Sequence, residues 1–330
     1  MITKTELENF VERIVVLDRI IIQAHDFPDH DAISSAYALA HLFQAKGATT
    51  LIVYNGNIDR ISLSNMIDWL EIPVFHINQV TLSPADKIVT VDGCIGEKNV
   101  LDLPGDEIAV IDHHQVTAPP NLWFSDIRPE YGATATILYE YYCLLGLKMP
   151  RNVATALMVG LNIDTANLTR GFVNADIRSF AYFNNNARLD IVNKVCRNEI
   201  ELKELALFTH AMSRVQIELG VATVFMTVAC PKNMLGILSD FLLKVNEIDV
   251  VIVATQANDN IQISLRSECP KTNVGLVARE ILNDSGRGFG GGHSHMAGGI
   301  ILKDHKHHFG LIDQYHFKPF VERFIELRTV

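Results

Sequence analysis

Short apolar runs alternate with amphipathic stretches along the first part of the chain. Four runs are typical of buried strands: Ile20–Ala24, Thr50–Tyr54, Lys87–Val91 and Ile108–Ile111. Three amphipathic stretches predict helices: Thr5–Leu17, Ala32–Lys46 and Ser64–Leu70. The first of these carries a capping-box pattern at Thr5 and Glu8. The alternation predicts an α/β fold, with a mostly parallel sheet that has helices on both faces.

The pattern becomes helical after Tyr131 and alternates again after Arg214. The helical part predicts four helices: Gly132–Leu145, Asn152–Leu161, Ala175–Asn184 and Ile191–Met212. The last part predicts a hairpin around Gly220, formed by Val215–Leu219 and Ala222–Val228. It also predicts two helices, Asn233–Val245 and Val274–Leu282, and two strands, Val250–Ala254 and Ile261–Leu265. A glycine-rich loop is predicted at Gly286–Gly292. We therefore expect a first domain over residues 1–186, a helical linker over 187–213 and a smaller α/β domain over 214–330.

Composition narrows the classes of function. The 330 residues are 48% hydrophobic, which is enough for two cores, and the net charge is -10. That charge disfavours binding of duplex nucleic acid, although a local cluster of cations can still hold a small phosphorylated ligand. The five cysteines form no CxxC pair, and no apolar run approaches the roughly 18 residues of a membrane span. With a charged N-terminus that is not typical of a signal peptide, these features predict a cytoplasmic protein that does not bind membranes.

The stretch HDFPDHDA directly follows the first buried strand. His25, Asp29 and Asp31 are then expected above the edge of the sheet, where parallel strands place functional side chains. A mixed set of imidazole and carboxylate groups suits Mn²⁺, Fe²⁺ or Co²⁺. Taken alone, the stretch fits equally well with aspartates that cap a helix and a histidine satisfied in the core.

Further acidic and imidazole groups follow other strands. Asp92 ends KIVTVD, and Asp112, His113 and His114 end EIAVIDHH, where a capping role fits poorly. Asp112 is a candidate to orient a liganding histidine through its ring N–H. Asp164 ends an apolar helix, where the helix dipole disfavours a carboxylate. Six ligands are too many for one ion that keeps an open position. They suit two ions about 3.5–4 Å apart, with Asp92 as the bridge.

The motifs HDFPDHDA, VDGC, DHH and NIDT, in this order, resemble the four motifs of the DHH phosphoesterase superfamily. GFGGGHSHMAGG, at 288–299, resembles the glycine-rich motif of its DHHA1 domain. The most similar group is the oligoribonuclease and pAp-phosphatase group, related to the core of RecJ exonucleases. The resemblance implies two bound Mn²⁺ ions, with Mg²⁺ or Co²⁺ as other candidates. The implied ligands are the same six residues: His25, Asp29, Asp31, Asp92, His113 and Asp164.

Three stretches depart from the family pattern. His30 stands where the family often has a small residue, and DTANLTR replaces the DTGxF form. RPEYGATATILYEYY is similar to a different branch of the superfamily. The departures spare the metal ligands and concern the substrate.

The second domain offers candidates for substrate binding. The resemblance implies that Gly290, Gly291 and Gly292 let the backbone approach a phosphate, with His293 beside it. Arg266 is a candidate for a bidentate phosphate contact, and an edge-strand surface arginine is the alternative. The GxGxxG pattern at Gly286–Gly291 follows a helix and is not typical of a dinucleotide fold. The 305–308 histidine group is more typical of a solvated turn than of a metal site.

These observations predict a dinuclear metal-dependent phosphoesterase with its active site between the domains. A metal-bridged hydroxide is expected to attack phosphorus, with Asp92 as a catalytic residue. The resemblance implies that His114 is also catalytic and contacts the transferring phosphoryl group. We expect as substrates single-stranded oligonucleotides of about two to five nucleotides, or pAp-like nucleotides, because no basic stripe tracks a long strand. Pyrophosphatase or exopolyphosphatase, dinucleotide phosphodiesterase and non-catalytic nucleotide sensor remain as alternatives. An apolar helical linker is also compatible with a homodimer.

Overall fold

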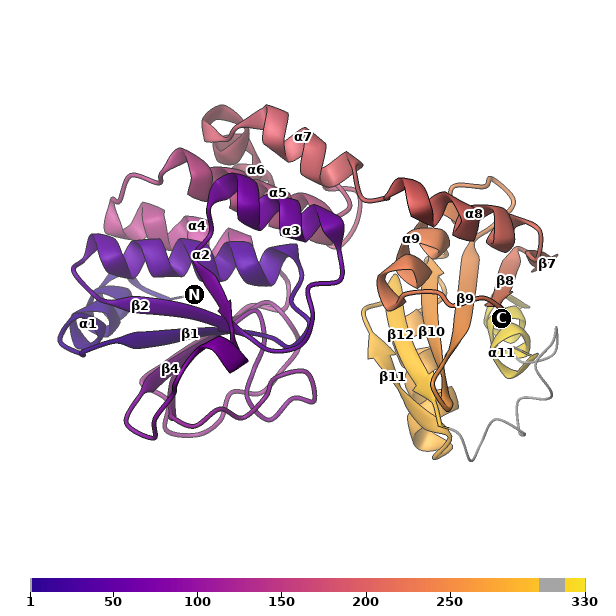
Figure 1. Ribbon diagram of the computed structural model, residues 1–330, viewed down its shortest axis with the longest axis horizontal. Helices are drawn as coiled ribbons and strands as arrows, with labels where there is room; N and C mark the ends of the chain where they lie inside the picture. Colours follow the sequence, from indigo (N-terminus) through magenta and orange to yellow (C-terminus); the bar gives the residue numbers. More distant parts are fainter. Residues whose placement is uncertain (1, 303–317, 330) are drawn as a thin grey trace. The chain divides into compact units, whose positions relative to one another are not determined.

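The computed structural model describes residues 2–302 and 318–329, so the histidines at 305–308 lie outside the described residues. The chain divides into two compact units, Met1–Glu199 and Ile200–Val330 (Figure 1). None of the helices in these described ranges is long and apolar enough to cross a membrane. Each unit is built around a six-stranded sheet with its own core.

The first unit has a wholly parallel sheet in the order β3-β2-β1-β4-β5-β6. The strands are β1 (Ile20–Ala24), β2 (Thr50–Tyr54), β3 (Val74–His76), β4 (Lys87–Val91), β5 (Asp106–Asp112) and β6 (Phe124–Ile127). Every residue of β1 is buried because this strand lies in the middle of the sheet. Both predicted features, the α/β class and the parallel sheet, are confirmed, although β3 and β6 are too short for the apolar pattern to reveal.

The α-helices of the first unit share one core with one face of the sheet. They are α1 (Lys4–Val15), α2 (His30–Ala45), α3 (Ile61–Leu70), α4 (Thr134–Leu145), α5 (Arg151–Asp164), α6 (Asn174–Asn186) and α7 (Leu189–Arg197). In Figure 1, α2, α3 and α5 lie on the same side of β1 and β2. On the opposite face Ile21, Val53 and Ile88 pack with Leu103 and with the 3₁₀-helix η1 (Ile77–Gln79). A short 3₁₀-helix and connecting segments thus cover the face where longer helices were expected.

Two local predictions in this region are wrong. The capping box of α1 is formed by Thr3 and Glu6, two residues before the predicted pair, and it starts the helix one residue early. The predicted helix Ile191–Met212 is broken after α7. A separate 3₁₀-helix, η2 (Leu202–Glu204), starts from a capping box of Glu201 and Glu204 and leads into α8 (Leu205–Met212).

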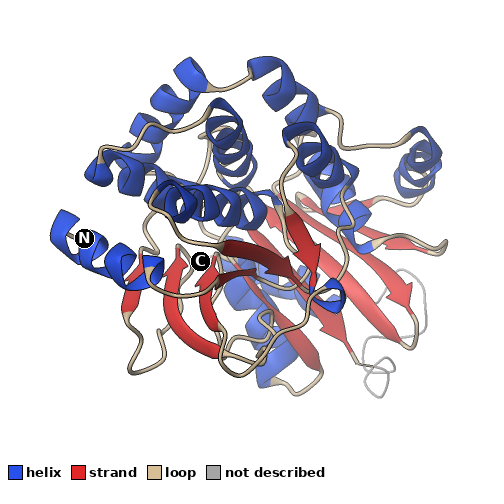
Figure 2. Ribbon diagram, turned by 60° about the vertical axis from the view of Figure 1, so that its left-hand side comes forward, coloured by secondary structure: helices blue, strands red, loops and turns tan. Residues whose placement is uncertain are grey.

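The second unit has a mixed sheet in the order β11-β12-β10-β9-β8-β7, in which β8 and β9 pair in parallel. The strands are β7 (Gln216–Glu218), β8 (Val221–Met226), β9 (Val250–Ala257), β10 (Asn260–Ser267), β11 (Gly288–Gly292) and β12 (Met296–Ile301). The helices of this unit are α9 (Lys232–Leu242), α10 (Val274–Ala278) and α11 (Lys318–Thr329). Apolar side chains of α9 form one core cluster with strands of the sheet, and those of α10 and α11 form a second. A π-helical turn, η3 (Arg279–Asp284), extends α10. Figure 2 shows strands in red and helices in blue.

The predicted glycine-rich loop is wrong, because most of it is the edge strand β11. Close packing requires glycine at two positions of this segment. A Cβ at Gly288 would lie 1.9 Å from the carbonyl oxygen of Ile300, and one at Gly290 would lie 2.8 Å from Cδ1 of Leu282. The lack of side chains hides the strand from an analysis of hydrophobic periodicity.

Candidate metal centre

Imidazole and carboxylate groups converge at the carboxyl edge of the first sheet. They follow the ends of β1, β4 and β5 and occupy the start of α2 and the end of α5. Three groups bring possible ligand atoms within 4.8 Å of one another: His25 with Asp29 and Asp92, Asp31 with His113 and Asp164, and Asp92 with His113 and His114. The structure therefore brings together all six residues that the sequence predicts as metal ligands.

The two aspartates of the first motif have different surroundings. Asp29 is the N-cap of α2, and its Oδ1 accepts hydrogen bonds from the amides of Asp31 (3.0 Å) and Ala32 (3.1 Å). Its other oxygen, Oδ2, lies 3.8 Å from Nε2 of His25. The helix-cap and the ligand interpretations are thus compatible, because each uses a different oxygen of the same carboxylate.

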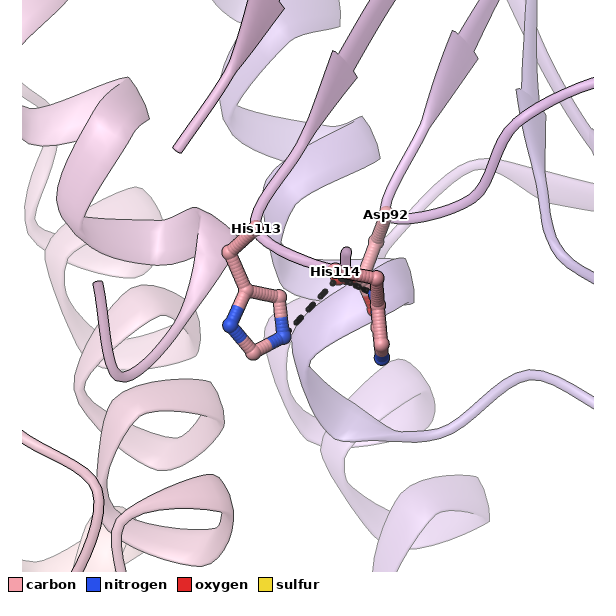
Figure 3. A group of neighbouring side chains, drawn as sticks. All are labelled: Asp92, His113 and His114. Atoms are coloured by element: carbon pink, nitrogen blue, oxygen red, sulfur yellow. Dashed lines mark ion pairs between the residues drawn. The ribbon is translucent and has the colours of Figure 1, made fainter. Parts of the chain in front are cut away.

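Asp92 lies between the two histidines His25 and His113. Its Oδ2 is 3.7 Å from Nε2 of His25, and its Oδ1 is 3.6 Å from Nε2 of His113. Figure 3 shows Asp92 and His113 projecting from neighbouring strand ends, with His114 beside them. The backbone of Asp92 is left-handed, with φ +57°, a conformation that is costly for a residue with a side chain and is concentrated at functional sites.

The start of α4 holds the buried carboxylates in place. Asp31 accepts hydrogen bonds from the amides of Thr134 (2.6 Å) and Ala135 (3.0 Å), and Thr134 Oγ1 donates to Asp92 Oδ1 at 2.8 Å. The sequence did not predict this role of Thr134. The helix starts at Thr134 without a side-chain cap, which leaves its first amides for another acceptor, but only the structure reveals this.

The remaining histidines are oriented by separate partners. The Nδ1 of His113 bonds the carbonyl oxygen of Tyr131 at 3.0 Å, which directs Nε2 toward Asp92 and Asp164. Asp112 Oδ1 lies 2.8 Å from Nδ1 of His114. Asp112 therefore orients His114, whereas the predicted liganding histidine, His113, is oriented by a backbone carbonyl.

Burial and charge strongly perturb the pKa values of the cluster. Burial and the nearby carboxylate of Asp92 raise the pKa of Asp31 to about 8. Burial also raises the pKa of Asp92 to about 6, although the charge of His114 opposes it. Burial alone would lower the pKa of His25, but Asp29 and Asp92 raise it to about 10. The buried carboxylates thus favour nearby positive charge, which helps them to remain ionised.

This environment fits divalent cations. Among the described residues, Oδ2 of Asp92 is a buried oxygen with no hydrogen-bond donor. Such a group is costly unless something else satisfies it. The mixed nitrogen and oxygen donors match the ligands that Mn²⁺ and neighbouring ions accept.

The predicted substrate residues of the second unit lie close together in that unit. Arg266 pairs with Met296 across β10 and β12, and Met296 accepts a hydrogen bond from the amide of His293 at 2.8 Å. Arg266 is only 4% exposed, and its Nε donates to Asp240 at 2.7 Å. The alternative of an edge-strand surface arginine is therefore wrong, because β10 is an inner strand.

Comparison with known families identifies both units. The N-terminal domain of the DHH family matches residues 19–161, and the DHHA1 domain matches residues 219–309. As the motifs predict, the chain combines a domain of the DHH family with a DHHA1 domain.

The chain is also similar to individual curated proteins. An uncharacterised protein of Methanocaldococcus jannaschii is 32% identical over 83% of this chain and 55% of the relative. A probable manganese-dependent inorganic pyrophosphatase of Streptococcus mutans is 26% identical over 45% of this chain and 49% of the relative. The chain thus spans about half the length of these two curated relatives.

A solved structure shares the DHH–DHHA1 fold. The exopolyphosphatase-related protein of Bacteroides fragilis superposes with a TM-score of 0.78, at 18% identity, and covers 99% of this chain and 97% of that chain. At this identity the likeness concerns the fold alone.

Proposed function

We propose that this protein is a metal-dependent phosphoesterase that hydrolyses small phosphorylated nucleotides. One observation carries the proposal. Six side chains that could bind a metal converge from separate segments, and the two oxygens of Asp92 face His25 and His113 respectively. The match of residues 19–161 to the DHH family supports the same reaction class.

The six residues are proposed to hold two divalent cations. His25 and Asp29 would hold one, and Asp31, His113 and Asp164 would hold the other. Asp92 belongs to the first group, and its Oδ1 lies 3.6 Å from Nε2 of His113 in the second. When bound, such ions neutralise charge on phosphoryl oxygens and supply a nucleophile from water at neutral pH. The manganese dependence in the name of the Streptococcus mutans relative favours Mn²⁺ here.

His114 is proposed to contact the phosphoryl group. Burial lowers its pKa, but the hydrogen bond to Asp112 outweighs this and raises the pKa to about 9. At neutral pH the ring is then a cation held in a fixed orientation. A cation at this position favours the extra negative charge that develops during phosphoryl transfer.

The DHHA1 domain is proposed to bind the end of the substrate that does not react. Gly290, Gly291, Gly292 and His293 would surround a terminal phosphate, with Arg266 as its charged partner. Asp240 fixes the guanidinium of Arg266 through Nε. In this division of roles, residues 1–186 carry the chemistry and residues 214–330 carry substrate binding.

Substrates are proposed to be pAp-like nucleotides or single strands of about two to five nucleotides, because one local anion site suits one terminal phosphate. A pyrophosphatase or exopolyphosphatase is the second candidate, favoured by the names of relatives.

The test is a panel of substrates assayed with Mn²⁺: pAp, linear and cyclic dinucleotides, longer strands, pyrophosphate and polyphosphate. Faster release of phosphate from pyrophosphate than from any nucleotide would favour the second candidate. Nucleotide binding without any hydrolysis would indicate a sensor.

A further inference from the structure

Phe27 is an unusual residue within the first metal-binding motif. It lies between His25 and Asp29, its backbone has φ +53°, and its side chain is 52% exposed. A left-handed conformation is unfavourable for an aromatic residue, and an exposed phenyl ring gains little from burial. Core packing therefore does not explain why a strained position carries this ring.

The loop after β2 supports the ring of Phe27. A Cβ at Gly56 would lie 2.8–2.9 Å from three atoms of the ring, so only glycine leaves room for it there. The amide of Phe27 donates to the carbonyl of Asn55 at 2.9 Å, and His30 Nε2 lies 3.0 Å from Ser62 Oγ. Polar contacts thus connect both ends of segment 55–62 to the first motif. One side of the ring rests on backbone while half of its surface remains accessible.

Arg60 lies within segment 55–62, between Gly56, which contacts Phe27, and Ser62, which contacts His30. Its side chain is partly exposed and makes no hydrogen bond or ion pair with any residue of the described ranges. Arg60 is the N-cap residue of α3, two residues before Ser62, whose Oγ lies 3.0 Å from Nε2 of His30. This contact places the backbone of Arg60 close to the first motif.

We propose that Phe27 and Arg60 form a nucleotide-binding edge beside the metal centre, in which the ring stacks on a base and the guanidinium pairs with a phosphate. A stacked aromatic ring accepts any base, and arginine matches phosphate geometry. The edge rests on the proposed function and makes it more specific. The substrates are then nucleotides that carry a base, and pyrophosphate and polyphosphate lack the group that Phe27 recognises.

Phe27→Gly is the decisive variant because it removes the ring and also relieves the backbone strain. The assay compares pApA with an abasic analogue in which tetrahydrofuran replaces one adenosine. We expect kcat/KM for pApA to fall about tenfold or more, mainly through KM, with little change for the abasic analogue. Phe27→Tyr should keep the wild-type values because it keeps the ring. Phe75→Ala removes another exposed ring, from the outer strand β3, and serves as the matched control.

Arg60→Gln should raise KM for both substrates, since both keep the phosphate, whereas Arg151→Gln should not. Arg151 is an exposed arginine at the opposite end of α5 from Asp164. Equal kinetics of Phe27→Gly and wild type on pApA would overturn the edge and leave the proposed function intact. If wild type hydrolyses neither substrate, the proposed function fails. Binding of an etheno-adenosine dinucleotide then decides, because the edge requires tighter binding by wild type than by Phe27→Gly.

Discussion

Thr134 Oγ1 donates a 2.8 Å hydrogen bond to Asp92 Oδ1, and both residues are buried. Thr134→Val removes this bond and keeps the shape of the side chain, while its backbone amide still bonds Asp31. We expect a loss of about 1.5–3 kcal/mol in the free energy of unfolding, typical of a hydrogen bond to a charged group. Affinity for Mn²⁺ should fall about 10- to 100-fold, as is usual when a group that orients a metal ligand is lost.

Urea unfolding and calorimetric metal titration test the Thr134→Val prediction. Thr155→Val is the matched control. Thr155 is also buried, but its hydroxyl donates to the carbonyl of Arg151 and accepts from the amide of Arg188, away from the cluster. The control should lose stability and keep its metal affinity. Equal metal affinities for both variants would contradict the positioning role of Thr134.

Asp92→Asn tests the proposed bridge between two cations. Asparagine tolerates the left-handed backbone at this position better than alanine does, so the variant isolates the loss of charge. We expect fewer than two Mn²⁺ ions per chain and a fall in phosphoesterase rate of at least 100-fold. In EDTA the variant should be no less stable than wild type, because one of several crowded carboxylates is neutralised. Two bound ions together with a normal rate would rule out the bridge.

Metal affinity should rise with pH. Asp31, with a pKa of about 8, and His25, with a pKa of about 10, both hold a proton at neutral pH and must lose it to bind a cation. Protons are therefore released on binding, and affinity increases from pH 6 to pH 8. Calorimetry in two buffers of different ionisation enthalpy counts these protons. An affinity that is independent of pH, with no protons released, would be the contrary result.

The buried Arg128 stabilises the segment that orients His113. Its Nε and one Nη donate to the two oxygens of Asp126 (2.8 and 2.7 Å), and the other Nη contacts Glu140 and the hydroxyl of Tyr131. Arg128→Met leaves Asp126 buried without its cation, so we expect a loss of about 3–5 kcal/mol in stability. Since the Tyr131 carbonyl bonds His113, metal affinity should fall as well.

An exposed arginine provides the comparison for Arg128. Arg178 is 64% exposed and lies 4.0 Å from Glu140, the same carboxylate that Arg128 contacts. Arg178→Gln should cost less than about 0.5 kcal/mol, because exposed ion pairs contribute little. Unfolding in urea compares the two variants, and similar losses would show that burial does not determine the effect.

The sequence predicted which side chains converge at this edge because parallel strands impose a simple rule. β1, β2 and β4 agree with their predicted bounds, and the carboxyl ends of neighbouring strands must meet at one edge. Asp92 and His113 could therefore be brought together without knowing any distance.

Features that depend on tertiary contacts could not be read from the pattern. Thr134 acts through a backbone amide and a hydroxyl that look like any helix start, and β11 has almost no side chains to reveal its period. Arg266 lies on an inner strand only because β10 has a neighbour, β12, that the apolar pattern did not reveal. These features arise when distant segments pack, and local sequence carries little trace of them.

The hydrogen bonds around the carboxylates also bear on which ions the centre accepts. Asp29 uses one oxygen to cap α2, both oxygens of Asp31 accept backbone amides, and Asp92 accepts the hydroxyl of Thr134. Each carboxylate thus has reduced freedom to rotate and coordinate through both oxygens at once. Ca²⁺ needs six to eight oxygen ligands and commonly obtains them through such bidentate carboxylates. The backbone of α2 and α4 would therefore limit the coordination number of a bound cation, and Ca²⁺ would be disfavoured by the count of available oxygens.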